Sequence, residues 1–413
     1  MRLTISFAAL FISVIFLQLH SGAMGPLDAL SGIQAGFSQT QVGLLGSAHF
    51  VGFFLGCWWA PRLMGSAGHI RAFAAFAATG TIGALAHPLY VDPIAWSFLR
   101  MMTGLAVAGC YTVVEAWLQA KVTNQTRGRT LGIYRFVDLV ASLVAQLLIG
   151  VLEPVSYISY NILAMLCCAA ILPLMLTTSK PPAPTGTPRL RPLKAIRLSP
   201  LGVAGVVVAG VTMPAFRMVG AVYGQEVGLR PDQIGIFLAI AILGGALVQL
   251  PAGWLADKFD RRWVLIGTSL ASILVCATTA MLESPTQTTV FVMGFLFGVF
   301  TMPVFSISAA HANDFADPDF VVDLSAALMF LYGIGAIFSP LLASFLIQNY
   351  GPGAMFAMIS IAHLGLVVFG LFRMTVRESS DTRSAYTYVP RTSFILGRLL
   401  KRRSAPKDDT PTR

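Results

Sequence analysis

Charged residues are scarce in this sequence. Asp, Glu, Lys and Arg together make up 11% of its 413 residues, whereas soluble globular domains carry about 25%. A water-soluble protein of this length could not cover its surface with so few charges, so the soluble globular class is excluded. Hydrophobic residues make up 56% of the chain, which indicates a protein that lies mostly within a lipid bilayer.

Cysteine and the motifs of enzymes are also scarce. No Cys–His spacing resembles a zinc site, and the chain has no nucleophile motif and no phosphate-binding loop. We therefore expect no metal, no cofactor and no enzymatic activity. Cysteines in apolar segments are typical packing residues. All five cysteines lie in such segments, namely Cys57, Cys110, Cys167, Cys168 and Cys276.

Apolar segments of about twenty residues are what the sequence has in abundance. About 20 apolar residues in a helix span the roughly 30 Å hydrocarbon core of a bilayer. Twelve such segments predict an all-α polytopic membrane protein with twelve transmembrane helices. The predicted spans are 3–30, 38–61, 70–90, 94–120, 130–152, 155–177, 201–224, 232–256, 263–283, 287–310, 324–348 and 353–375.

Positive charge is concentrated in alternate loops. The net charge is +10, and all 28 Lys and Arg except Arg100, Arg135, Arg217 and Arg230 lie at the N-terminus, in alternate loops or in the C-terminal tail. Loops rich in Lys and Arg stay in the cytoplasm by the positive-inside rule. This pattern predicts two cytoplasmic termini, and it assigns the basic charge to topology and anionic lipid instead of nucleic acid.

The longest polar break divides the spans six and six. It is rich in Pro, Gly and basic residues, a composition that resists both helix and strand. The sequence therefore predicts four parts: a six-helix bundle at 1–178, a cytoplasmic linker at 179–200, a second six-helix bundle at 201–376 and a cytoplasmic tail at 377–413.

The two halves are related in sequence. Gln41-Val42-Gly43-Leu44-Leu45 opens the second span, and Gln233-Ile234-Gly235-Ile236-Phe237 opens the eighth. Two parallel six-helix repeats joined by a basic loop are an architecture of secondary transporters, which bind their substrates near the midplane between the repeats.

Two motifs resemble those of the major facilitator superfamily. The segment Gly253-Trp254-Leu255-Ala256-Asp257-Lys258-Phe259-Asp260-Arg261-Arg262 resembles the signature loop that follows the second helix and its repeat. Its first-half copy, which starts at Pro61, has Gly65 in place of the acid. Arg100-Met101-Met102-Thr103-Gly104 resembles a second motif, in the fourth helix. The resemblance implies the twelve-helix fold of that superfamily and transport by alternating access.

A narrower resemblance is to the YcaD-like branch of bacterial facilitators. It rests on residues 109–118, on His311-Ala312-Asn313-Asp314 and on residues 331–340. That branch is largely uncharacterised, so the resemblance names no substrate. The Gly-Pro motif of drug exporters is absent from the fifth span, where residues 132–138 read GIYRFVD, which weakens an inference to drug efflux.

Three ionisable residues lie at similar depth in the fourth and fifth spans: Glu115, Arg135 and Asp138. Charges within a membrane normally face a partner or a wet cavity, so we expect Glu115 and Arg135 to pair and Asp138 to share a helix face with Arg135. Two interpretations stay open. The group exchanges a proton or contacts substrate, or it is a permanent ion pair that joins the two helices.

Other intramembrane residues give further candidates. Arg100 and Arg217 are predicted to flank a cavity and attract an anionic group; the alternatives are helix tethering for Arg100 and snorkelling for Arg217. First helices commonly line the cavity in this superfamily, which makes Gln18 and His20 candidates. Tyr332 is either a packing residue or an aromatic gate. Asp28 is interpreted as a cap or gate residue.

The 253–262 loop is predicted to be conformational. By the resemblance, Gly253, Asp257, Arg261 and Arg262 form a latch that stabilises one access state, with Asp257 paired to the arginines and to a helix N-terminus. The tail combines basic residues with Phe394, Ile395 and three leucines. It is predicted to form an amphipathic helix on anionic lipid, followed by a disordered end.

Together these features predict a secondary active transporter in the inner membrane of a bacterium. The expected substrate is a small molecule, with a mild preference for an organic anion or an amphipathic metabolite. Proton coupling through Glu115 and Asp138 is a further hypothesis, and a monomer is expected. The alternative is a non-transporting membrane sensor or lipid-handling scaffold with the same fold.

Overall fold

The computed structural model describes residues 2–123, 125–176, 189–317, 319–376, 386 and 393–395. Throughout these ranges the regular secondary structure is helical. Twelve of the helical segments are long and apolar enough to cross a membrane. The predicted all-α fold with twelve transmembrane helices is therefore confirmed.

Helix ends agree with the predicted spans to within a few residues. The first half contains α1 (Arg2–Gln34), α2 (Gln39–Ala67), α3 (His69–Ala86), α4 (Pro93–Lys121), α5 (Arg127–Leu147), α6 (Tyr157–Ala169) and α7 (Ile171–Met175), with short 3-10 turns η1 (His87–Leu89) and η2 (Leu148–Gly150). The second contains α9 (Pro200–Glu226), α10 (Pro231–Lys258), α11 (Arg261–Ala280), α12 (Gln287–Thr301), α13 (Pro303–Asn313), α14 (Val321–Tyr350) and α15 (Ala354–Val376).

Two predicted spans are broken where the sequence analysis expects continuous helices. The sixth divides between α6 and α7 at Ala170, and the tenth divides between α12 and α13 at Met302. Each break is followed by a proline, Pro173 or Pro303. Proline lacks a backbone N–H and its ring clashes with the carbonyl four residues earlier, so the helix ladder is interrupted there.

The linker differs from the prediction in one respect. A short helix, α8 (Pro192–Leu198), lies within the segment that was expected to resist helix formation. Pro192 occupies the first helical position, where the missing N–H costs nothing. The Pro- and Gly-rich part of the linker, residues 179–188, lies outside the described ranges.

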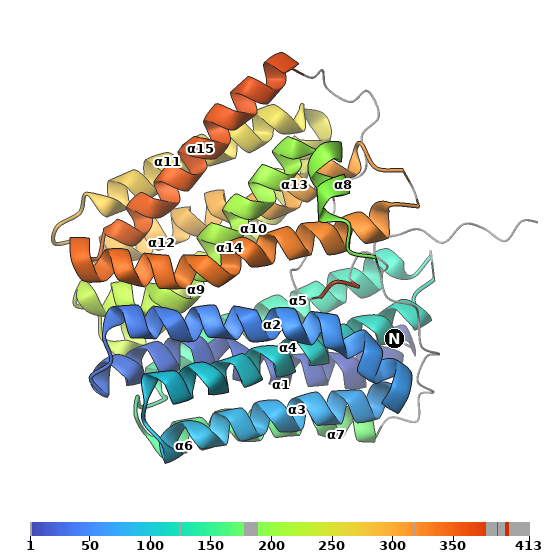
Figure 1. The fold of residues 1–413 in the computed structure, drawn as a ribbon, viewed down its shortest axis with the longest axis vertical. Helices are drawn as coiled ribbons and strands as arrows, with labels where there is room; N and C mark the ends of the chain where they lie inside the picture. Colours follow the sequence, from blue (N-terminus) through green and yellow to red (C-terminus); the bar gives the residue numbers. More distant parts are fainter. Residues whose placement is uncertain are drawn as a thin grey trace, which may run out of the picture.

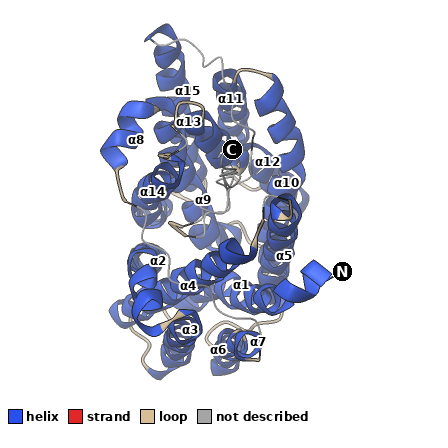
Figure 2. Cartoon of the chain, turned by 90° about the vertical axis from the view of Figure 1, so that its right-hand side faces the viewer, coloured by secondary structure: helices blue, strands red, loops and turns tan. Residues whose placement is uncertain are grey.

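The helices form two packed groups. The pairs α2–α4, α3–α4 and α1–α5 pack within the first group, and α9–α14, α10–α12 and α11–α15 within the second. Across the interface, α2 contacts α14 and α5 contacts α10. Figure 2 shows the two groups one above the other, viewed along the helix axes.

The two ends of the bundle have different features. We call the end that carries Arg2, Lys121, α8 and the α10–α11 turn the termini face, on the right of Figure 1, and the other end the opposite face. The two groups close together at the opposite face. Gln39 Nε2 donates to Glu226 Oε1 at 2.6 Å, and Thr40 Oγ1 donates to Gln348 Oε1 at 2.6 Å.

Close backbone contact strengthens this seal. Gly43 and Gly46 of α2 lie directly against Ser344 and Pro340 of α14, with no space for a β-carbon. Small residues allow helices in a membrane to approach in this way. The two groups are therefore in close contact near the opposite face.

Exposed tryptophans ring the termini face. Trp58 and Trp59 lie in the last turns of α2, Trp254 near the end of α10 and Trp263 at the start of α11, and all four are exposed. Amphipathic aromatic rings are enriched at the interface between membrane and water. Their position agrees with a bilayer boundary near this face.

Candidate functional site

A cavity of about 140 Å³ lies between the two helix groups. Both groups contribute polar and aromatic side chains to its wall. The first gives Gln18, Tyr111 and Asp138, and the second gives Arg217 and Tyr332. Four of the candidates predicted from the sequence, Gln18, Asp138, Arg217 and Tyr332, therefore come together around one cavity.

Three of these side chains form one hydrogen-bonded group. The Tyr111 hydroxyl lies 2.5 Å from Gln18 Oε1 and 2.7 Å from Asp138 Oδ1. A hydroxyl has one proton and can donate to one acceptor at a time. Either the Gln18 amide is turned so that its NH₂ faces Tyr111, or Asp138 carries a proton and donates it. The sequence analysis missed Tyr111, although its position four residues before Glu115 in an apolar helix was available as a signal.

Arg217 is the cation of the cavity. It lies on α9, where it is half-buried and lines the wall with Met213 and Met218. Among the described residues, no hydrogen bond or ion pair to its guanidinium is found, and its charge reaches Asp138 only as an electrostatic interaction. Arg217 therefore offers its donors to the cavity.

Most of the remaining wall is apolar and adaptable. Phe50 and Phe53 come from the first group, and Met302 and Met329 from the second. Methionine side chains are flexible and polarizable, and they fit ligands of irregular shape. Pockets of this kind, apolar with a few placed polar groups, are typical of small-molecule sites.

Glu115 lies deeper toward the termini face and is fully buried. Its carboxylate accepts a hydrogen bond from Tyr134 Oη at 3.2 Å and another from the Ser393 hydroxyl. Arg135 is half-buried next to Tyr134 on α5. The direct pairing of Glu115 with Arg135 stays a prediction, and Asp138 lies with Tyr111 and Gln18 instead.

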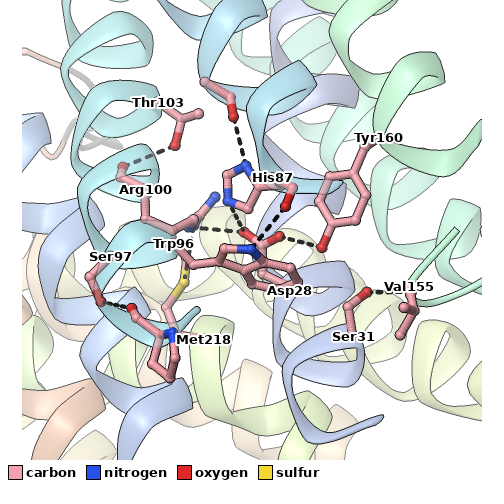
Figure 3. A network of polar contacts seen from close by, with 12 residues as sticks. Asp28, Ser31, His87, Trp96, Ser97, Arg100, Thr103, Val155, Tyr160 and Met218 are labelled. Carbon is pink, nitrogen blue, oxygen red and sulfur yellow. Dashed lines mark hydrogen bonds and ion pairs between the residues drawn. The ribbon is translucent and has the colours of Figure 1, made fainter. Parts of the chain in front are cut away.

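Arg100 is not among the residues that line the cavity and lies in a buried charge network near the opposite face (Figure 3). Its Nε lies 3.2 Å from Asp28 Oδ2. Tyr160 Oη donates to Asp28 Oδ1 at 3.0 Å, and His87 Nε2 lies 3.7 Å from Asp28 Oδ2. Arg100 Nη2 also reaches Met218 Sδ of the second group at 3.6 Å. This geometry favours the tethering alternative for Arg100 over the predicted contact with substrate.

The pairing of Asp28 with Arg100 was not predicted from the sequence, although the similar depth of the two residues in the membrane favoured it. Asp28 lies six residues before the end of α1, and Arg100 seven residues after the start of α4. At about 1.5 Å per residue the two are at similar distance from the opposite face. Sequence alone did not show that α1 and α4 are neighbours.

Two other candidates have defined surroundings. His20 is fully buried, and its Nδ1 lies 3.0 Å from the Leu163 carbonyl oxygen, which joins α1 to α6. Tyr332 lines the cavity and packs edge-on against Phe305, with ring centroids 5.5 Å apart. His20 therefore has a packing environment, whereas Tyr332 both packs against a neighbour and lines the cavity, so both of its interpretations stay predictions.

The predicted latch residues take part in three ion pairs, two of them through Arg261. Arg261 Nη2 lies 3.0 Å from Asp257 Oδ1, and Arg261 Nη1 lies 2.6 Å from Asp314 Oδ1. Arg262 pairs with Asp260 at 2.7 Å instead of with Asp257. Burial raises the pKa of Asp260, but the Arg262 hydrogen bonds outweigh it and the pKa lies below the usual value. Asp314 is the partner that the sequence analysis did not identify.

The C-terminal tail is described at only four positions, residue 386 and residues 393–395. Phe394 and Ile395 were expected on the apolar face of a lipid-bound helix, yet both are buried among protein side chains. The rest of the predicted amphipathic helix lies outside the described residues.

Comparison with known proteins gives consistent matches. The family profile described as Major Facilitator Superfamily matches residues 203–405. An uncharacterized MFS-type transporter YcaD from Salmonella newport (strain SL254) is 25% identical over 387 residues, covering 92% of this chain and 97% of the relative. The YcaD protein of Escherichia fergusonii is 27% identical over 354 residues, with 84% and 89% of the two chains covered.

Solved structures share the fold at low sequence identity. The nucleoside transporter NupG has a TM-score of 0.74 at 13% identity, covering 90% of this chain and 100% of that one. A D-xylose–proton symporter has a TM-score of 0.68 at 13% identity, with 92% and 99% covered. Both likenesses concern the fold.

Proposed function

We propose that this chain, which belongs to the major facilitator superfamily, moves a small amphipathic organic anion across the membrane by alternating access. The observation that carries this proposal is the Arg217 guanidinium, which faces the central cavity without a hydrogen-bond or ion-pair partner among the described residues. We place the protein in the inner membrane of a bacterium as a monomer, with both termini cytoplasmic.

Electrostatics favours an anionic group on the substrate. A charge that is removed from water without a partner is costly, and a guanidinium pairs bidentately with carboxylate or phosphate. A substrate anion would supply the partner that Arg217 lacks. The Phe and Met side chains around it would hold an apolar part of the same molecule.

Proton coupling is proposed at Asp138 and Glu115. The Tyr111 hydroxyl lies between two oxygens of Gln18 and Asp138, an arrangement that a proton on Asp138 would complete. Because Arg217 acts on Asp138 electrostatically, a substrate anion on Arg217 would weaken that influence. Binding of the anion would then favour proton uptake by Asp138.

The test combines binding and transport by purified protein. Stabilisation against heat is measured with a panel of aliphatic and aromatic carboxylates and organophosphates, and compounds that bind are tested for counterflow in proteoliposomes. Loss of a charge-assisted hydrogen bond costs about 1.5–3 kcal/mol, so Arg217→Gln should weaken binding about 10- to 150-fold. Arg217→Lys, which keeps the charge, should lose less.

The outcomes separate the alternatives. Equal binding of neutral compounds by the wild type and Arg217→Gln would overturn the anion proposal. Binding without counterflow would favour a non-transporting sensor. Counterflow whose pH dependence is unchanged in Asp138→Asn and Glu115→Gln would remove proton coupling while leaving transport in place.

A further inference from the structure

We propose that Ser393, Phe394 and Ile395, called the plug, close the cavity from the termini face and compete with any ligand that enters from that side. All three residues are buried although they belong to the tail beyond α15. In Figure 1 this segment, drawn in dark red, lies between the two helix groups, far from the end of α15. Its contacts are with the interior of the bundle.

Phe394 lines the cavity. Its side chain is part of the wall that also contains Asp138 and Arg217. The ring packs edge-on against Phe54 of α2, with centroids 5.3 Å apart, and Phe54 in turn packs against Phe330 of α14 at 5.0 Å. The Phe394 ring is therefore part of a row of edge-to-face aromatic contacts that joins both helix groups.

The neighbours of Phe394 attach the plug to the first group. The Ser393 hydroxyl donates to Glu115, which lies six residues, or roughly 9 Å along the axis, inside the end of α4. Ile395 belongs to the buried apolar cluster of the first group that includes Trp117. The backbone of Phe394 is within hydrogen-bonding reach of the Cys57 thiol.

Tyr386 forms a second attachment, on the second group. Its backbone N–H donates to Asp257 Oδ1 at 2.9 Å, and its hydroxyl donates to Gln249 Oε1 at 2.9 Å. Its ring lies against Gly253, where a β-carbon would collide with it. The tail therefore contacts α10 of one group and α4 of the other.

Because of these contacts, the plug would compete with a ligand for space in the cavity. Phe394 fills space within the cavity wall, and Ser393 uses an oxygen of Glu115, one of the candidate groups for proton exchange. A ligand that enters from the termini face needs the same space. Plug and ligand would then favour different states of the protein, and binding of one would reduce binding of the other.

Disulfide trapping tests the location of the plug in the full-length chain. A variant that keeps Cys57 as its only native cysteine and carries Phe394→Cys is oxidised in membranes, and linked peptides are identified by mass spectrometry. Disulfide formation requires Cα atoms within about 7 Å. We expect a Cys57 cross-link. The matched control keeps only Cys168, which is exposed on α6, and should give none.

Cavity labelling tests the closure without any substrate, so its outcome is independent of the proposed transport. Ser142 lines the cavity from α5, and Ser142→Cys in a cysteine-free chain reports access of a maleimide from the termini face. Phe394→Gly removes a buried ring, which should raise the labelling rate about tenfold or more. Ser393→Glu, which sets a second carboxylate against Glu115, should do the same; Ser393→Ala should change it less.

Two results would overturn the proposal. One is the absence of the Cys57 cross-link under conditions in which the protein is folded. The other is a Ser142→Cys labelling rate that is the same in the wild-type tail, Phe394→Gly and Ser393→Glu. Both tail variants should remain folded at the labelling temperature, so that increased labelling would come from an open cavity.

Discussion

Two arginines in the bundle have different electrostatic environments. Arg100 is enclosed with Asp28, His87 and Tyr160, whereas Arg217 faces a cavity and has no such partner among the described residues. The same residue type is thus enclosed among partners at one site and lines a cavity at the other. The sequence predicted the same role for both arginines, because it shows the charge of a residue and its depth in the membrane but not the direction in which its side chain points.

The buried pair gives a prediction for stability. Removing one partner of a buried ion pair leaves an uncompensated charge and costs about 3–5 kcal/mol. Asp28→Asn and Arg100→Gln should each lower the unfolding temperature in detergent. The double variant should recover part of the loss, because neither charge is then left alone. Additive losses in the double variant would contradict a direct pairing.

At the scale of elements, the crossing of α2 and α4 depends on two glycines. Gly52 lies against the Met101 carbonyl and Gly104 against the His49 carbonyl, and neither position has space for a β-carbon. Gly104 ends the Arg100–Gly104 motif that the sequence analysis identified. The packing explains why a glycine is needed there: the two helix backbones touch.

Gly104→Ala should therefore destabilise the protein by about 1–3 kcal/mol, the usual cost of overpacking. The matched control is Gly132→Ala on α5, where nothing lies within 4 Å of the new β-carbon. That change should be neutral or stabilising, since alanine favours helix over glycine. Thermal unfolding of both variants in detergent is the measurement, and equal melting temperatures would contradict the proposed backbone contact.

Sequence alone predicted the elements well because bilayer thickness fixes the length of each apolar segment. It missed the breaks at Ala170 and Met302, although Pro173 and Pro303 were visible, since a proline can also kink a helix without dividing it. It collected Gln18, Asp138 and Arg217 as candidates but did not show that they share a cavity. The Asp28–Arg100 pair was missed because it joins α1 to α4, and tertiary packing decides which helices are neighbours.

The orientation of the whole molecule is a prediction from basic charge. In a cysteine-free chain, Gly186→Cys lies in the basic linker and Glu283→Cys in the exposed turn between α11 and α12 at the opposite face. A membrane-impermeant maleimide added to intact cells should label Glu283→Cys and leave Gly186→Cys unlabelled. The reverse pattern would place the termini outside the cytoplasm.

The latch should bias the exchange between access states. Asp257 is about half exposed (51%) in its pair with Arg261, so the contact contributes about 0.3–1 kcal/mol. Asp257→Asn should shift the ratio of the two states about two- to fivefold toward access from the termini face and slow turnover, with folding intact. Labelling of Ser142→Cys from each side measures the ratio.

Asp260→Asn is the control for this shift. It removes the charge that pairs with Arg262, keeps a side-chain oxygen for the cap at the start of α11, and leaves Asp257 in place. If the ratio of access states changed equally in both variants, Asp257 would have no specific role beyond that of the other charges in the loop. The Asp257 variant should also loosen Tyr386, because one oxygen accepts from both Arg261 and the Tyr386 backbone.

The ring of tryptophans at the termini face has an optical consequence. Of six tryptophans, Trp96 and Trp117 are buried and the other four are exposed in the outer turns near that face. Lipids brominated in one leaflet only would therefore quench most of the accessible fluorescence from one side and little from the other. The intrinsic emission of the protein thus serves as a label-free indicator of its orientation in each reconstituted vesicle population.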